Sequence, residues 1–337
     1  MKLLLPLLFV LTSSATLASE RGQYAIENID PPPTKHGTDQ IDALCMTADG
    51  DLAVGLPSGE LWIRDSKSGE WSLFAEGLHN PLGMIVEGKD GFIVTQRPEL
   101  THVRDSDGDG KADQYLCLTD DFGMSGNYHE FNFTPVRGAE GDIFFGLGTA
   151  SSGAGVTKIV RGEFNPNGRP GRMHASVPYR GWIVRYSPKD GALTPWSSGH
   201  RTPNGLGFDL QGRLYVTDNQ GDWVGSSKLF LVERGRFYGH PASLNWREDI
   251  TTPALDLGAE KLNALRTRAA VIFPHGTMAN SPTQPLVDDT GGKFGPFAGQ
   301  LFVGEMNQAR IMRVIVEEVD GVVQGACVPF WDEAGLS

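Results

Sequence analysis

The sequence is poor in cysteine and contains no Cys-x-x-Cys-His motif. Three cysteines in 337 residues, Cys45, Cys117 and Cys327, are too few for a disulfide scaffold. One bridge stays open as an alternative, but buried free thiols are the expected state. The missing motif excludes covalently attached c-type haem in this chain.

Positive charge is also scarce, and several catalytic motifs are missing. Lysine and arginine number 29 against 41 aspartate and glutamate, a net charge of −12. This balance argues against nucleic acid or an anionic membrane as the partner, and it suits an exported protein that binds calcium or neutral sugars. No glycine-rich phosphate cradle, Ser-His-Asp elbow or zinc motif occurs.

The first nineteen residues have the order of a signal peptide. Lys2 is followed by an apolar run over Leu3–Leu11 and by small residues at 16–18. That run is too short to span a bilayer, and no later run is long and apolar enough. We therefore predict a signal peptide over 1–19, a mature domain over 20–337 without a membrane span, and a periplasmic or secreted location.

A short pattern recurs along the mature chain. Each copy has a turn glycine, one variable residue, an apolar strand and a small or polar end, starting at Gly50, Gly91, Gly141, Gly212 and Gly299. Glycine supplies the positive φ of a hairpin turn, and the apolar run is typical of a strand buried on both faces. A strand is expected before each turn, at 43–45, 83–86, 131–133, 205–208 and, less clearly, 294–297. More amphipathic strands follow, as in Glu60–Ile63 and Trp182–Tyr186.

Several strands per repeated unit are the signature of propeller blades, because stacked blades bury each other's faces. The 43 glycines and 21 prolines fit many tight turns. We therefore predict an all-β propeller with about five blades in this chain, and with loop insertions at 150–180 and 240–290. A β-sandwich is the alternative, although a sandwich does not require a recurring unit.

One acidic loop has the spacing of a calcium site. Carboxylates stand at loop positions 1, 3, 5 and 9: Asp105, Asp107, Asp109 and Asp113. Gly110 occupies position 6, and Lys111 would contribute its backbone carbonyl. Leu116 replaces the bidentate glutamate of an EF-hand, and the loop follows a strand. The pattern favours a weak structural calcium site between two outer strands of the second blade, with a solvated acidic turn as the alternative.

The most informative segment is Gly199-His200-Arg201-Thr202-Pro203-Asn204-Gly205, with the strand that ends on Thr217-Asp218-Asn219. It resembles the "GHRNPQG" loop of the soluble quinoprotein glucose/sorbosone dehydrogenases, which depend on pyrroloquinoline quinone (PQQ). The resemblance covers about residues 40–335 and is tightest over 181–240. It implies a six-bladed propeller, so we expect this chain to be incomplete at its C-terminus. In bacterial relatives a c-type cytochrome domain often follows, which implies a possible cytochrome electron acceptor.

The resemblance also assigns roles to single residues. His129 matches the general base that takes the substrate's hydroxyl proton. Arg201 matches the arginine that stabilises negative charge beside the quinone. Backbone oxygens after Gln220 match those that hold the calcium that polarises PQQ. The implied cofactor-binding residues are Arg201, Thr202, Asn204, Asn219, Gly221 and Asp222. Thr202 and Asp222 depart from the family, which has asparagine and proline there.

The predicted activity is therefore the PQQ-dependent oxidation of a sugar-type hydroxyl or aldehyde, and several alternatives remain open. His129 and Arg201 could instead be a core histidine and a loop-bracing arginine. Pro203-Asn204-Gly205 also resembles gluconolactonase-type propellers, in which Asn, Asp and Glu from several blades bind one metal, but only Asn204 matches that set. A non-catalytic propeller that binds glycans or proteins is the third interpretation, with Tyr179 and Trp246 suited to sugar stacking.

Overall fold

The computed structural model describes residues 24–36, 40–154, 161–168 and 171–332. The predicted signal peptide lies outside these residues. The chain divides into two compact units, residues 1–30 and 31–337. Residues 24–30 of the first unit have no regular secondary structure. Within the described part of the chain, every helix is too short or too polar to cross a membrane.

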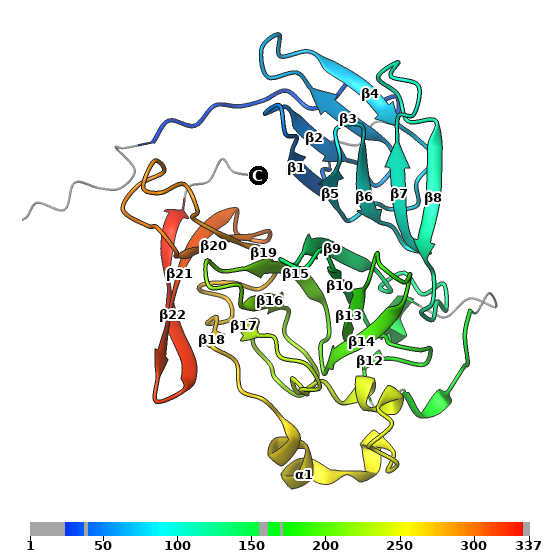
Figure 1. Ribbon diagram of the computed structural model, residues 1–337. Helices are drawn as coiled ribbons and strands as arrows, with labels where there is room; N and C mark the ends of the chain where they lie inside the picture. The colour runs from blue at the N-terminus through cyan, green and yellow to red at the C-terminus, as the bar shows by residue number, and fades with distance from the viewer. Residues whose placement is uncertain (1–23, 37–39, 155–160, 169–170, 333–337) are drawn as a thin grey trace, which may run out of the picture. The chain divides into compact units, whose positions relative to one another are not determined.

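The second unit contains five four-stranded antiparallel sheets (Figure 1). The first has β1 (Ala43–Met46), β2 (Leu52–Gly55), β3 (Leu61–Arg64) and β4 (Trp71–Ala75). The second has β5 (Gly83–Glu87), β6 (Gly91–Thr95), β7 (Leu100–Arg104) and β8 (Gln114–Thr119). The third has β9 (Asn132–Arg137), β10 (Ile143–Leu147), β13 (Trp182–Tyr186) and β14 (Leu193–Ser198). The fourth has β15 (Pro203–Phe208), β16 (Leu214–Asp218), β17 (Lys228–Leu231) and β18 (Val271–Ile272). The fifth has β19 (Pro282–Val287), β20 (Leu301–Glu305), β21 (Arg310–Val319) and β22 (Val322–Asp332).

The insertions carry the remaining elements. A two-stranded sheet pairs β11 (Ala150–Ser151) with β12 (Met173–His174). Short 3-10 helices η2 (Ser152–Ala154) and η3 (Pro166–Gly168) lie in the same insertion. The second insertion contains η4 (Pro241–Trp246), η5 (Ala254–Asp256) and α1 (Gly258–Leu265).

The repeated pattern forms the hairpin between the first two strands of a sheet. Gly141 and Gly212 have φ of 91° and 76°, which side chains other than glycine rarely adopt, and each stands just before the second strand. Those second strands, β10 and β16, are buried at every residue. Both strands begin with apolar residues because neighbouring sheets cover both of their faces, and β16 ends on the buried polar residues Thr217 and Asp218.

Consecutive sheets stack through their first strands, β1 on β5, β5 on β9, β9 on β15 and β15 on β19. Apolar clusters fill each junction; the one between the third and fourth sheets contains Val136, Ile183, Leu206 and Val216. This is the fold of a β-propeller, so the predicted fold class is confirmed and the sandwich is excluded. The described residues form five blades, and a sixth remains a prediction.

Two details of the sequence analysis were wrong. The weak strand expected at 294–297 is a loop, and the first strand of the fifth sheet is β19 instead. β19 contains Pro282 and Pro285, and because proline is unusual in a strand the sequence did not indicate one there. Phe294 and Phe297 instead pack against Phe302 and Phe330 of the same sheet. All three cysteines are free as predicted, but Cys117 is exposed instead of buried.

Candidate functional site

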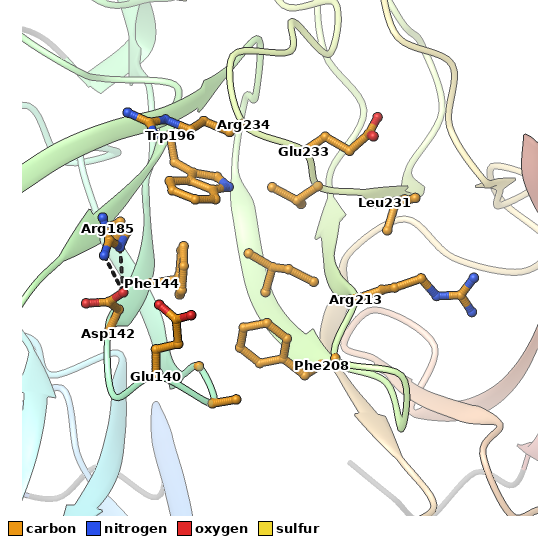
Figure 2. A pocket seen from close by; sticks show the side chains of 15 residues that line it. Glu140, Asp142, Phe144, Arg185, Trp196, Phe208, Arg213, Leu231, Glu233 and Arg234 are labelled. Atoms are coloured by element: carbon orange, nitrogen blue, oxygen red, sulfur yellow. Dashed lines mark hydrogen bonds and ion pairs between the residues drawn. The ribbon is translucent and has the colours of Figure 1, made fainter. Parts of the chain in front are cut away.

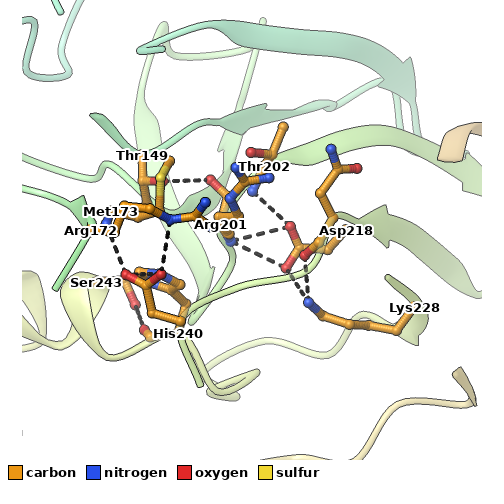
Figure 3. Close-up of polar contacts among 11 residues, drawn as sticks. Thr149, Arg172, Met173, Arg201, Thr202, Asp218, Lys228, His240 and Ser243 are labelled. Carbon is orange, nitrogen blue, oxygen red and sulfur yellow. Dashed lines mark hydrogen bonds and ion pairs between the residues drawn. The ribbon is translucent and has the colours of Figure 1, made fainter. Parts of the chain in front are cut away.

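The loop over residues 199–205 is held by one buried carboxylate (Figure 3). Asp218, at the end of β16, is 1% exposed. Its oxygens accept hydrogen bonds from the backbone amides of Arg201 at 3.2 Å and of Thr202 at 2.7 Å. The register of β15 against β16 shifts between Pro203 and Gly205, just after the residues whose amides bond to Asp218.

Asp218 is paired with the buried cation of Lys228, at the start of β17. The Lys228 Nζ lies 3.5 Å from Asp218 Oδ2, and it donates a hydrogen bond of 2.6 Å to the backbone carbonyl of Asn219. Burial by itself raises the pKa of Asp218, but Lys228, His200 and the two amides outweigh it and lower that pKa. Asp218 is therefore an anion at neutral pH that fixes the loop.

Arg201 has a fixed backbone and one buried side-chain donor without a partner. Its carbonyl accepts hydrogen bonds from the Thr149 amide and hydroxyl, both at 2.9 Å. Its Nε is buried without a partner. Burial lowers the pKa of the guanidinium and the charge of Asp218 opposes this. An unpaired buried donor on a cation is the feature expected where an anionic ligand binds.

His129 contacts β11, the short strand that directly follows Thr149. Its Nδ1 is 2.5 Å from the Ser151 hydroxyl, and its backbone amide donates to Asn127 Oδ1 at 3.0 Å. Ser151 is two residues beyond Thr149, which bonds to Arg201, so one short segment links the two predicted catalytic residues. The His129 ring is exposed rather than part of the core. Its pKa is lowered by partial burial first and then by the positive charges of Arg201, Arg172 and Arg97.

Two further polar groups near Arg201 lack partners. Asn219 Oδ1 is buried without a hydrogen bond, and so are both ring nitrogens of His240. Burial lowers the pKa of His240 to about 4, so this ring is neutral at physiological pH. With Arg201 Nε, these atoms form a set of buried polar groups that a bound ligand or water would satisfy.

The other predicted cofactor-binding residues make hydrogen bonds within the protein. Asn204 donates a hydrogen bond of 2.6 Å to the Pro282 carbonyl of the next blade. The Gly221 amide bonds to Val224. The Asp222 carboxylate accepts from the Met173 amide at 2.8 Å and lies 3.5 Å from Arg172 and 3.9 Å from His240. Thr202, Asn219 and Arg201 are thus adjacent, whereas the Asn204 side chain is directed at the fifth sheet.

The acidic loop lies between β7 and β8, where the sequence placed it. Asp105, Asp107 and Asp109 each offer a carboxylate oxygen, and these atoms lie within 4.8 Å of one another. Asp113 is turned to Ser106, whose hydroxyl is 2.6 Å away. The Lys111 amide donates to Asp109 Oδ1 at 2.8 Å. Three of the four predicted carboxylates are therefore close together, and the fourth is engaged elsewhere.

A buried polar network beneath the His129 loop was missed by the sequence analysis. Arg97 donates to the carbonyls of Asn127 and Tyr128, and Arg180 donates to Gly123 at 2.9 Å. Arg180 is fully buried, and Glu130, with 1% exposure, faces it as the counter-charge. These residues lie far apart in sequence and belong to no motif, so only the folded chain brings them together.

A cavity among the described residues lies at the opposite strand ends from this site. It measures about 640 Å³ and is lined by residues near the turns before β10 and β16, among them Asp142, Phe144 and Arg213 (Figure 2). None of the residues predicted for catalysis or cofactor binding lines it. The candidate site is therefore defined by its unsatisfied polar atoms rather than by cavity size.

Comparison with known proteins places these features in a family. Residues 63–274 match a family described as a domain of unknown function, DUF7133. The chain belongs to the DUF7133 family. The matched residues run from β3 to just past β18, so they include His129, Arg201 and the Asp218–Lys228 pair. No curated protein matches the sequence.

Solved structures similar to this DUF7133 chain share its fold. A glucose dehydrogenase is 17% identical with a TM-score of 0.60, covering 86% of this chain and 87% of the other. A putative oxidoreductase (glucose dehydrogenase) of Thermus thermophilus is 16% identical with a TM-score of 0.58, covering 86% and 84%. The PQQ domain of pyranose dehydrogenase from Coprinopsis cinerea, in its holo form, is 13% identical with a TM-score of 0.57, covering 88% and 79%. At these identities the likeness shows the propeller fold.

Proposed function

We propose that this DUF7133 chain is an exported PQQ-dependent dehydrogenase that oxidises a sugar or another alcohol. The observation that carries the proposal is the set of unpaired buried polar atoms at Arg201 and Asn219, together with the charge of Arg201 that acts on His129. The proteins of similar fold include glucose dehydrogenases and a PQQ domain, which supports the same chemistry. Export rests on the residue order of the first nineteen positions.

The residues present fit a planar anionic quinone. PQQ carries several carboxylates, and the site holds the cations Arg201 and Arg172, whose charges both act on His129. Arg201 would bind the cofactor through its free Nε, and Asn219 would accept a hydrogen bond through Oδ1. The backbone oxygens near Gly221 would hold the associated calcium. When bound, the quinone supplies the hydride acceptor.

The protein's own part is to bind, orient and remove a proton. His129 is neutral because burial and three arginines lower its pKa, so the ring is able to accept a proton. When Ser151 accepts a hydrogen bond from Nδ1–H, Nε2 carries the free lone pair. Arg201 supplies positive charge where negative charge develops on the substrate or quinone oxygen. Asp218 and Lys228 keep the Arg201 loop in place.

The direct test is binding and turnover with added cofactor. Purified protein should bind PQQ in the presence of Ca²⁺, measured by quenching of tryptophan fluorescence, and then reduce a dye with an aldose or alcohol from a panel. We expect Arg201→Met to weaken PQQ binding about 10- to 100-fold, because a hydrogen bond to a charged group contributes about 1.5–3 kcal/mol. Arg234→Met, which removes an exposed arginine outside the site, is the matched control.

Two results would contradict the quinoprotein proposal. If the folded protein shows no saturable PQQ binding, or if both arginine variants bind equally well, the quinoprotein proposal is wrong. Hydrolysis of a lactone with Ca²⁺ or Zn²⁺ alone would favour the lactonase interpretation instead. Within the described ranges, Asp105, Asp107 and Asp109 form the one group of three or more His, Cys, Asp or Glu side chains that could hold a metal ion. No observation at Asn204 favours the lactonase interpretation.

We also propose that the Asp105–Asp109 loop binds calcium weakly and structurally. With a dissociation constant near 1 mM, as in extracellular modules, 10 mM Ca²⁺ should add about 1.4 kcal/mol of stability. Calorimetry should show this rise in melting temperature for the wild type and its loss in Asp107→Asn. Asp121→Asn, an exposed acid outside the loop, should behave as the wild type. An equal rise in melting temperature with Ca²⁺ in all three proteins would mean that the loop is only an acidic turn.

A further inference from the structure

Trp196, on the outer strand β14 of the third blade, lines two cavities away from the candidate site. One is the cavity of about 640 Å³ in Figure 2, and the other measures about 500 Å³. Both are lined by Trp196 and Arg234. Each lies within the range of about 300–1,000 Å³ that small-molecule sites occupy. The two cavities therefore adjoin at Trp196 and Arg234.

The smaller cavity is lined by four large aromatic residues: Tyr179, Trp182, Trp196 and Trp246. Three of these rings are held in place by contacts within the protein. Trp182 Nε1 donates to the Ser243 carbonyl at 3.1 Å and Trp246 Nε1 to the Ala175 carbonyl at 2.8 Å. Tyr179 packs edge-on against Trp182 at 5.9 Å. The aromatic lining is thus preformed and does not need to order on binding.

Tyr179 also has a strained backbone. Its φ is 65°, a left-handed value that is uncommon for a bulky residue. Such strain persists only where the surrounding structure enforces it, and it is frequent at ligand sites. Here it places the ring in the lining of the cavity.

The charged groups around the aromatic rings balance one another. Arg234 and Arg247 face Glu248 and Asp249 in the same lining. Arg247 is already paired with Asp249, at 2.8 and 2.6 Å. Arg234 is exposed, and its guanidinium lies over the Trp196 ring, 5.4 Å from the centroid. A balanced lining disfavours a strongly charged ligand and provides both donors and acceptors at its edge.

We propose that this surface is a binding groove for a neutral oligosaccharide. Flat aromatic rings suit the apolar C–H faces of sugar rings, and the arginine and carboxylate groups at the edge suit their hydroxyls. Two adjoining cavities around Trp196 accommodate several linked sugar units rather than one. The groove does not depend on the quinone chemistry proposed above, and it would anchor the protein to a glycan while the other site acts.

The experiment uses the full chain without PQQ and a panel of neutral hexasaccharides: cello-, xylo-, manno- and chito-oligomers. Isothermal titration calorimetry should detect one of them with an affinity in the millimolar range or tighter. Trp196→Ala should weaken that affinity at least about tenfold. Trp71→Ala, which removes another half-buried tryptophan in the first blade, should not change it.

A second variant covers the case in which Trp196→Ala fails to fold. Thr194, half-buried on the same strand, lines the smaller cavity, so Thr194→Arg fills the groove without removing a packed ring. It should also abolish binding, and dye reduction with PQQ should persist in both groove variants if the proposed enzyme activity is correct. Absence of binding by every hexasaccharide, or equal binding by Thr194→Arg, would overturn the proposal. Binding of a polyproline peptide but no sugar would assign the groove to protein recognition instead.

Discussion

His129→Ala should lower quinone-dependent dye reduction about 10²- to 10⁴-fold, the usual contribution of a general base. The melting temperature should stay nearly unchanged, because the ring is exposed and loses one side-chain hydrogen bond, to Ser151. His275→Ala, an exposed histidine outside the site, is the control for non-specific effects. A large fall in melting temperature with unchanged turnover would mean that His129 is structural rather than catalytic.

The role of His129 as the base should also appear in the pH dependence of turnover. A protonated imidazole cannot accept the substrate proton, so turnover should be present at neutral pH and fall as the pH decreases. Burial and the neighbouring arginines lower the pKa of His129, so the midpoint should lie below the ordinary histidine value of about 6.5. A midpoint above that value, or a profile that persists in His129→Ala, would contradict the assignment.

Lys228→Met should destabilise the protein by about 3–5 kcal/mol, the effect of leaving a buried charge without its partner. Lys228 and Asp218 have side-chain exposures of 3% and 1%, so water cannot replace the lost cation. Chemical denaturation should show the change as a lower midpoint with a similar slope. The matched variant is Lys228→Met with Asp218→Asn, which removes both charges and should recover part of the loss.

The pH dependence of that loss has a defined sign. In the wild type, the pKa of Asp218 is lowered, so the pair stabilises the protein above the unfolded value of about 3.9 and this is lost at acid pH. Without Lys228, burial remains and raises the pKa of Asp218, so the carboxyl is better tolerated when protonated. The difference between wild type and variant should therefore shrink as the pH falls toward 4. A constant difference would mean that Lys228 acts through packing rather than charge.

The sequence predicted the fold well where its local signals agree. Gly141 and Gly212 stand before apolar runs that predict strands buried on both faces, and β10 and β16 follow at those positions. It failed at β19, where Pro282 and Pro285 are unusual in a strand and the nearby phenylalanines gave a stronger apolar signal. The prolines are accommodated because the register of β19 against β20 shifts between them.

The candidate site was predictable only in part. The Arg201 loop and the His129 loop stood out as residue patterns, and so did the carboxylates of Asp105, Asp107 and Asp109. The sequence did not indicate that Asn204 bonds to Pro282 in the next blade or that Asp113 turns to Ser106. Spacing along the chain restricts which oxygens can meet, but it does not decide which partner each one takes.

By itself, the sequence determined the repeated hairpins and hence the propeller fold, because turn glycines and buried strands act through neighbours along the chain. Only the tertiary structure decided which polar groups are satisfied. Lys228 pairs with Asp218 on the neighbouring strand, ten residues away along the chain. Arg180 bonds to Asn132, from which a hairpin and an insertion separate it. Trp196 and Trp246 line one groove although fifty residues separate them. Burial and pairing depend on contacts between distant segments, and those contacts exist only once the blades have stacked.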